Sequence, residues 1–132
     1  MIKYMLDTNI CIFTIKNKPA SVREKFNLHK QQLCISSVTL MELIYGAEKS
    51  DAPERNLAVI EGLTARLEVL TYGPQAAAHT GQIRAEQARQ GRPIGPYDQM
   101  IAGHARSCGL IVVTNNTREF ERVSGLRIED WI

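Results

Sequence analysis

The chain has 132 residues, of which 44% are hydrophobic and 23% are charged, a composition that excludes a disordered chain and favours one globular domain spanning residues 1–132. Its 16 Lys and Arg against 14 Asp and Glu leave a net charge of +2, which neither requires nor excludes a nucleic-acid partner. With no apolar run of membrane-spanning length, no secretory pattern and no closely spaced cysteine pair, we expect a cytoplasmic protein without membrane contact and with reduced thiols.

The first half of the chain is predicted to open with a buried strand and then to mix helices and strands. Residues 7–9 (Asp-Thr-Asn) supply a helix start after the first apolar run, and residues 36–37 (Ser-Ser) supply another after the second. In chain order, the predicted elements are a strand at 2–6, a helix at 10–15, a helix at 21–30, a strand at 33–35, a helix from 37 to about 49 and a helix at 53–66.

The second half continues this alternation, with Gly91 and Gly109 ending two helices and Pro96 opening one. Its predicted elements are a strand at 67–71, a helix at 74–90, a helix at 96–108, a strand at 110–114, a short helix after 115–117 and a strand at 126–128. Strands that alternate with helices and are apolar on both faces form a parallel sheet covered on both sides. The predicted fold class is therefore α/β, a three-layer α/β/α sandwich with a central parallel sheet.

Three acidic residues are predicted at the edge where such a sheet binds ligands, outside the carboxyl ends of its strands. Asp7 follows the first strand directly, Glu42 lies on the helix that leaves the second, and Asp98 is the third residue of helix 96–108. Each has an ordinary alternative role. Asp7 and Asp98 are suited to capping a helix, and Glu42 to pairing with a Lys or Arg or to reaching water at a rim.

Carboxylates that converge at one edge repel each other, and without compensation some would be protonated at neutral pH. A hard divalent cation, Mg²⁺ or Mn²⁺, resolves this conflict because it prefers oxygen ligands. An ion held in this way activates water and neutralises the charge that grows on a phosphate. The residues alone therefore indicate a metal-dependent hydrolase of phosphate esters.

Four ordered segments resemble PIN-domain ribonucleases, and more closely the VapC toxin branch of that superfamily. They are residues 6–9 (LDTN), 36–46 (SSVTLMELIYG), 91–98 (GRPIGPYD) and 113–120 (VTNNTREF). The resemblance covers essentially the whole chain. It implies a PIN-like fold in which Asp7, Glu42 and Asp98 form the acidic, catalytic Mg²⁺ or Mn²⁺ site.

The resemblance also assigns supporting roles around this site. Where many PIN domains have a further aspartate after the fourth strand, this chain has Asn116, with Glu119 one helical turn on, so we expect one firmly held ion. Asn116 is expected to orient the water by hydrogen bonding. The residues expected to support the metal ligands are Thr8, Asn9, Thr114 and Glu119.

The activity implied by the resemblance is that of the toxin of a type II toxin–antitoxin pair. Such a toxin is a metal-dependent endoribonuclease, and the expected substrate is the anticodon stem-loop of initiator tRNA, whose cleavage stops translation. The alternatives are a non-catalytic PIN module that binds RNA or protein, a metal-dependent phosphatase and a DNA nuclease. The candidate phosphate contacts are six basic residues: Lys16, Lys18, Lys25, Arg84, Arg89 and Arg92.

The expected partner is a cognate VapB antitoxin that places a basic residue among the three acids. Its flexible tail is expected to bind an apolar groove between helix segments 10–15 and 41–47, against Phe13, Ile44 and Tyr45. The toxin is expected to form a homodimer within a larger hetero-oligomer, which contacts operator DNA only through the antitoxin.

Overall fold

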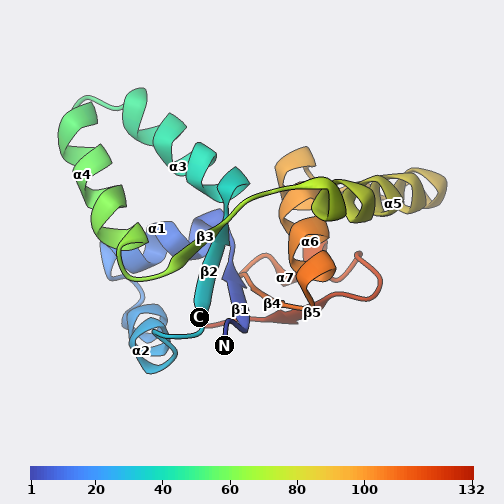
Figure 1. Cartoon of the computed structure of the whole chain (residues 1–132), viewed down its shortest axis with the longest axis horizontal. Helices are drawn as coiled ribbons and strands as arrows, with labels where there is room; N and C mark the ends of the chain where they lie inside the picture. The colour runs from blue at the N-terminus through green and yellow to red at the C-terminus, as the bar shows by residue number, and fades with distance from the viewer.

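The computed structural model describes residues 1–132 and contains a five-stranded parallel sheet between two groups of helices (Figure 1). The strands lie in the order β3-β2-β1-β4-β5, and every neighbouring pair is parallel. The strands are β1 (Tyr4–Leu6), β2 (Leu33–Ser36), β3 (Glu68–Leu70), β4 (Ile111–Val113) and β5 (Arg127–Glu129). The predicted three-layer α/β/α sandwich is therefore confirmed.

Seven helices connect or follow these strands: α1 (Thr8–Lys16), α2 (Ala20–Leu28), α3 (Ser37–Glu48), α4 (Pro53–Thr64), α5 (Pro74–Gln90), α6 (Pro96–Cys108) and α7 (Thr117–Phe120). Each predicted strand and helix is present, and no boundary of a predicted range differs by more than two residues. None of the helices combines the length and the apolar character needed to cross a membrane.

Local signals in the sequence explain where the helices begin and end. Asp7 caps α1 by accepting a hydrogen bond from the Ile10 N–H at 2.9 Å, and Ser36 caps α3 by accepting one from the Val38 N–H at 3.1 Å. A proline occupies the first turn of α4, α5 and α6. Glycines in the left-handed conformation end α5 and α6.

The alternation of side chains along each strand divides the interior into two cores. Tyr4 and Leu6 of β1 point toward α1, α2, α3 and α4, whereas Met5 between them points toward α5, α6 and α7. In Figure 1 the two groups of helices lie on opposite sides of the sheet. Because the strands are only three or four residues long, β1, β2 and β4 each contribute one or two side chains to each core, whereas the edge strands β3 and β5 contribute only to the core on the α5–α7 side.

The prediction that the strands are apolar on both faces is correct for β1, β2 and β4 but wrong for the two edge strands. Glu68 and Val69 of β3 and Arg127 of β5 are exposed. Edge strands have a neighbour on one side only, and charged residues there discourage pairing with another chain. The cysteines are free thiols as expected, although Cys108 is exposed at the end of α6.

Candidate active site

The candidate site lies at the carboxyl end of the parallel sheet, where loops and helix starts from distant parts of the sequence meet. Asp7 directly follows β1, and Thr114 follows β4. Glu42 is on α3, which leaves β2, and Asp98 is in the first turn of α6. The starts of α3 and α6 lie above the same end of the sheet (Figure 1).

Asp7 is almost completely buried, with 3% of its surface exposed. Burial raises its pKa from 3.8 to about 6 because a buried carboxylate loses its hydration, and the Glu42 and Asp130 carboxylates raise the pKa further by repulsion. Hydrogen bonds from the Thr114 side chain and from the Ile10 N–H oppose this shift. The fold therefore fixes the position of Asp7 but makes its ionised form less favourable.

Asp98 is half-buried at the third position of α6. Burial raises its pKa to about 6, and three carboxylates add to the shift by repulsion: Asp7 first, then Glu42 and Glu119. Asp98 therefore lies within electrostatic range of both other predicted site acids. The structure brings the three acids together although they are far apart in the sequence.

Glu42 is held by a contact from α1. The Thr8 hydroxyl donates a hydrogen bond to Oε1 of Glu42 at 2.7 Å, so its partner is a threonine rather than the Lys or Arg of the alternative role. Thr8 is the first residue of α1 and directly follows Asp7. Thr8 therefore links two of the three acids, Asp7 through the chain and Glu42 through its hydroxyl.

The electrostatics of this edge suit a bound cation. Neither lysine nor arginine is among the groups that shift the pKa of Asp7 or Asp98, so no basic side chain of the protein compensates these carboxylates. No three acidic, histidine or cysteine side chains are arranged closely enough to enclose a metal. A cation at this edge would therefore take part of its coordination shell from water, as hard divalent cations commonly do, and not from side chains alone as in a closed zinc site.

The supporting residues predicted from the sequence are distributed unevenly. Thr114 is buried and contacts Asp7, while its hydroxyl accepts a hydrogen bond from the Asn116 N–H at 2.9 Å. Glu119 lies within electrostatic range of Asp98, and Asn116 is half-buried at the start of α7. Asn9 is exposed. The structure gives Asn9 no contact with the acids.

One acidic residue near the site was not predicted from the sequence. Asp130 follows β5, and its charge contributes to the raised pKa of Asp7. The signal was available, since β5 is parallel to β4 and its carboxyl end therefore lies at the same edge of the sheet. The sequence gives Asp130 no clear place because the predicted last strand ends at residue 128, one residue before the end of β5.

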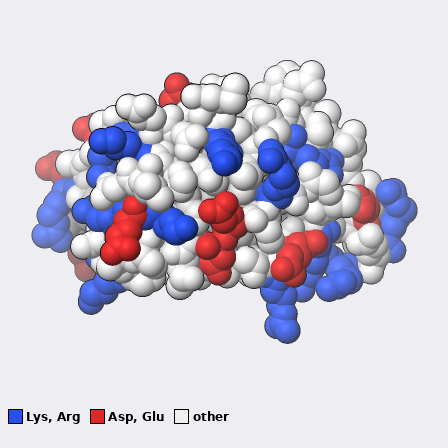
Figure 2. Space-filling view, turned by 90° about the horizontal axis from the view of Figure 1, so that it is seen from below, with Lys and Arg blue, Asp and Glu red and all other residues white.

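The six basic residues predicted to contact phosphate are exposed but do not form one surface. Lys16, Lys18 and Lys25 belong to the α1–α2 side of the sheet, whereas α5 and the loop after it, with the three arginines, lie on the other side. In the view from below, basic and acidic side chains are interspersed across the molecule (Figure 2). The structure therefore separates the candidates into two alternative contact surfaces.

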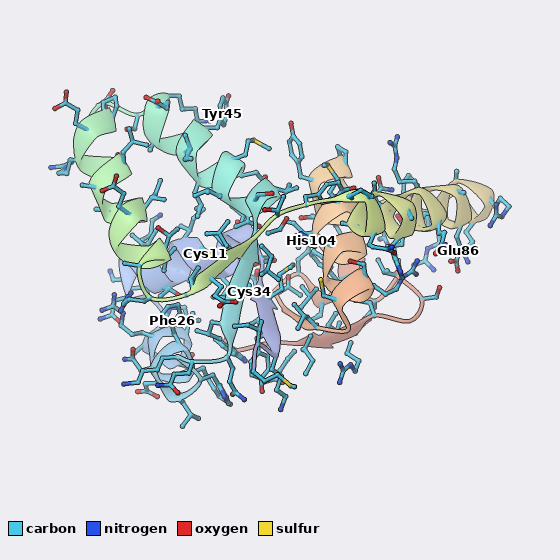
Figure 3. All side chains as sticks on the ribbon, in the orientation of Figure 1. Cys11, Phe26, Cys34, Tyr45, Glu86 and His104 are labelled. Carbon is cyan, nitrogen blue, oxygen red and sulfur yellow. The ribbon has the colours of Figure 1, made fainter.

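The apolar groove predicted between α1 and α3 exists, but its lining differs from the prediction. A cavity of about 290 Å³ is bounded by α1, α3 and also α4, and none of Phe13, Ile44 and Tyr45 lines it. Tyr45 is 62% exposed and points away from the body of the molecule (Figure 3). At 100° per residue, Ile44 and Tyr45 lie on the face of α3 opposite the groove-lining positions. The groove residues are Ile12, Ile15, Lys16, Glu42, Leu43, Gly46, Ala47, Asn56, Val59 and Ile60.

Comparison with known proteins agrees with this architecture. The PIN domain family matches residues 4–126. A Shigella flexneri protein named tRNA(fMet)-specific endonuclease VapC is 79% identical over 131 residues, which is 99% of each chain. The crystal structure of DNA-bound VapBC from Salmonella typhimurium superposes with a TM-score of 0.96 at 74% identity, and that of VapBC2 from Rickettsia felis, bound to a DNA fragment, with 0.93 at 36% identity; both cover 100% of both chains.

A parallel sheet with acidic residues gathered at its carboxyl end, together with these matches, defines a nuclease of the PIN-domain class. PIN-domain nucleases are metal-dependent in general, in agreement with the uncompensated carboxylates at this edge. More narrowly, the chain belongs to the VapC family, the ribonuclease toxins of VapBC toxin–antitoxin systems. The resemblance seen in the sequence is thus confirmed.

Proposed function

We propose that Asp7, Glu42 and Asp98 hold a single Mg²⁺ ion, directly or through its bound waters, with Mn²⁺ as a substitute, for hydrolysis of RNA phosphodiesters. The observation that carries the proposal is the shared electrostatics of Asp7 and Asp98. Both have a pKa raised to about 6, each lies near other carboxylates, and no basic side chain compensates them. When bound, the ion supplies an activated water and neutralises charge that develops on the phosphate.

The protein's own residues have distinct roles in this proposal. Thr114 and the Ile10 N–H hold Asp7, and Thr8 holds Glu42, so the two carboxylates are oriented before substrate binds. Asp7 and Asp98 must both lose their protons to bind the ion, which favours activity above pH 6. The amide of Asn116, next to Thr114, orients the attacking water.

A direct attack by water needs no nucleophilic side chain. Ser36 and His104 are the one pair that resembles a nucleophile and its base, with Ser36 Oγ and His104 Nδ1 2.8 Å apart. Both are buried, and Ser36 Oγ already accepts the capping hydrogen bond of α3. Burial also lowers the pKa of His104. This pair therefore stabilises the fold and has no access to substrate.

The proposed substrate is initiator tRNA, cut in its anticodon stem-loop, and the consequence is inhibition of translation. Support comes from the relatives in Shigella flexneri and Salmonella typhimurium, which are 79% and 75% identical and are named tRNA(fMet)-specific endonucleases. A single-stranded loop also exposes its backbone to a crevice at a sheet edge. A tRNA substrate places the enzyme in the cytoplasm.

The proposed partner is a VapB antitoxin that occupies the apolar groove beside Glu42 and places a basic residue among the acids. The solved relatives from Salmonella typhimurium and Rickettsia felis are VapBC complexes with DNA, which supports this assembly. We extend it to a toxin homodimer within the hetero-oligomer, with operator DNA contacted through the antitoxin. The alternatives of a non-catalytic module, a phosphatase or a DNA nuclease are not favoured, because the relatives are named ribonucleases.

The test is cleavage of purified tRNA with Mg²⁺ or with EDTA, followed by mapping of the new 5′ ends. We expect discrete fragments from initiator tRNA with Mg²⁺, none with EDTA, and none from Asp98→Asn. The matched control is Asp51→Asn, which removes one exposed carboxylate from the turn between α3 and α4. Full cleavage by Asp98→Asn would refute the metal site, and cuts spread over all tRNAs would refute the substrate.

A further inference from the structure

Gln87 on α5 is a buried polar residue that the proposed chemistry does not use. Only 1% of its surface is exposed, although the helix around it is largely polar. A buried amide is costly unless its donors and acceptors are paired, so its partners show what it does. All of them lie in segments that surround the start of α6.

The loop between α5 and α6 is held by both carbonyl groups of Gln87. Its main-chain oxygen accepts a hydrogen bond from the Arg92 N–H at 3.0 Å, and its side-chain Oε1 accepts one from the Ile94 N–H at 3.2 Å. Pro93, between them, has no N–H to offer. Gln87 thus binds two alternate backbone donors of a loop that has no regular structure of its own.

The same side chain also contacts α6 next to Asp98. Oε1 of Gln87 accepts a second hydrogen bond from Nε2 of Gln99 at 3.1 Å. The capping residue of α6 is Gly95, which has no side chain to fix the first turn. A Cβ added to Gly95 would lie 3.9 Å from Oδ2 of Asp98, so this carboxylate lies over the loop that Gln87 holds.

The amide nitrogen of Gln87 reaches the segment that follows α7. It donates to the Arg122 main-chain oxygen at 3.5 Å, and the Arg122 N–H in turn donates to the Glu119 main-chain oxygen at 3.0 Å. The preceding residue of α5, Glu86, accepts a hydrogen bond from the Ser124 hydroxyl, and Figure 3 shows it directed toward that loop. Gln87 therefore connects the two segments that carry Asp98 and Glu119.

We propose that Gln87 is a positioning residue, which sets the place and orientation of the Asp98 carboxylate by holding the loop before α6 and the first turn of α6 from beneath. The proposal rests on the proposed function, in which Asp98 is a metal ligand. Gln87 itself touches neither metal nor substrate. Residues that hydrogen-bond metal ligands directly typically contribute about 10–100-fold to metal affinity, and Gln87, which acts through the backbone and neighbour of Asp98, is expected at the lower end of that range.

The test measures Mn²⁺ binding to the purified full chain by calorimetry, together with kcat and KM for tRNA. Gln87→Met keeps the length of the side chain and removes its three side-chain hydrogen bonds, while the main-chain bond to the Arg92 N–H remains. We expect Mn²⁺ affinity to fall about 10-fold or more and kcat to fall with it, while KM for tRNA stays within about twofold. Lost packing or lost stability alone would not produce this pattern.

The matched control is Thr80→Val, on the same buried face of α5. It also removes a buried hydrogen bond, since Thr80 Oγ1 lies 2.9 Å from the Tyr72 hydroxyl, but this bond is remote from the loop before α6. We expect Thr80→Val to lower the unfolding temperature and to leave Mn²⁺ affinity within about twofold. Equal Mn²⁺ affinity of Gln87→Met and wild type would overturn the proposal.

Two further variants keep the result decisive. If Gln87→Met does not fold, Gln99→Met removes one of the same hydrogen bonds and is expected to weaken Mn²⁺ binding about threefold to tenfold; an unchanged affinity would again overturn the proposal. Asp98→Asn distinguishes failure of the proposed metal site from failure of the proposed role of Gln87. If it binds Mn²⁺ as wild type does, the metal site is wrong; if it loses Mn²⁺ while Gln87→Met binds normally, only the role of Gln87 is wrong.

Discussion

Replacing Asp7 by Asn should stabilise the metal-free protein at neutral pH. The folded protein keeps a proton on Asp7 up to about pH 6, whereas the unfolded chain releases it near 3.8. The folded state therefore binds more protons between these values, and the free energy of unfolding falls as pH rises from about 4 to about 6. Since one pKa unit corresponds to about 1.4 kcal/mol, the charge on Asp7 costs the fold about 3 kcal/mol at pH 7.5.

Asn removes this cost and keeps most of the local structure. Its side-chain oxygen can still accept the Ile10 N–H, so the cap of α1 is retained, but hydrogen bonds to a neutral acceptor are weaker. We therefore expect a net gain of about 1–2 kcal/mol at pH 7.5, or a rise in Tm of about 3–6 °C, and no gain near pH 3.5.

The assay is thermal unfolding followed by circular dichroism in EDTA at both pH values, with Asp51→Asn as the exposed control. Added Mg²⁺ should raise the Tm of the wild type by mass action and leave that of Asp7→Asn unchanged. A gain of equal size at pH 3.5 and 7.5 would show that packing rather than charge is responsible. A loss of stability at pH 7.5 would refute the reasoning.

Three further predictions concern the surroundings of the acids. Thr8→Val removes the hydroxyl that holds Glu42 and should lower kcat about tenfold with little change in KM, measured by initial rates on tRNA. The two basic groups, Lys16, Lys18 and Lys25 on one side of the sheet and Arg84, Arg89 and Arg92 on the other, are to be neutralised separately. We expect that one of the two variants has a weaker dependence of kcat/KM on salt and that the other is unchanged, because only one side can face the RNA. Equal effects of the two variants would contradict the separation. Val59→Asp changes a groove residue that is 41% exposed and should abolish copurification with the antitoxin while RNA cleavage persists.

The fold was predictable because its signals are local. Helix starts such as Asp7 and Ser36, prolines in first turns and glycines at helix ends mark the boundaries without any knowledge of tertiary contacts. The alternation of short apolar runs with helices then leaves a parallel sheet as the natural arrangement. The exposed faces of β3 and β5 could not be predicted, because the order of the strands in the sheet is set by tertiary contacts.

The candidate site was predictable only in part, because contacts between distant segments leave no local signal in the sequence. Asp7 follows from the rule that ligands bind at the carboxyl ends of parallel strands, whereas Asp98 was singled out by its place in the first turn of a helix that no strand precedes. Gln87 gives no local signal, because it is one of several polar residues in a largely polar helix, and it is buried only by the packing of α5 against its neighbours. Two of the predicted groove residues, Ile44 and Tyr45, were assigned to the wrong face of α3, and the third wall of the groove, α4 with Val59, is a tertiary contribution that no local signal shows.

The two roles that the sequence offers for Asp7, helix cap and metal ligand, do not compete. The capping bond uses Oδ1 of Asp7 and fixes its orientation, and it also lowers the pKa that burial raises. A carboxylate serving only as a cap would be expected at a helix start open to water, where its charge costs little. Here the fold buries it near Glu42 and Asp130, without a lysine or arginine among the groups that shift its pKa. The structure thus maintains an unfavourable charge, and a bound cation would offset the lost hydration and the repulsion that raise the pKa of Asp7.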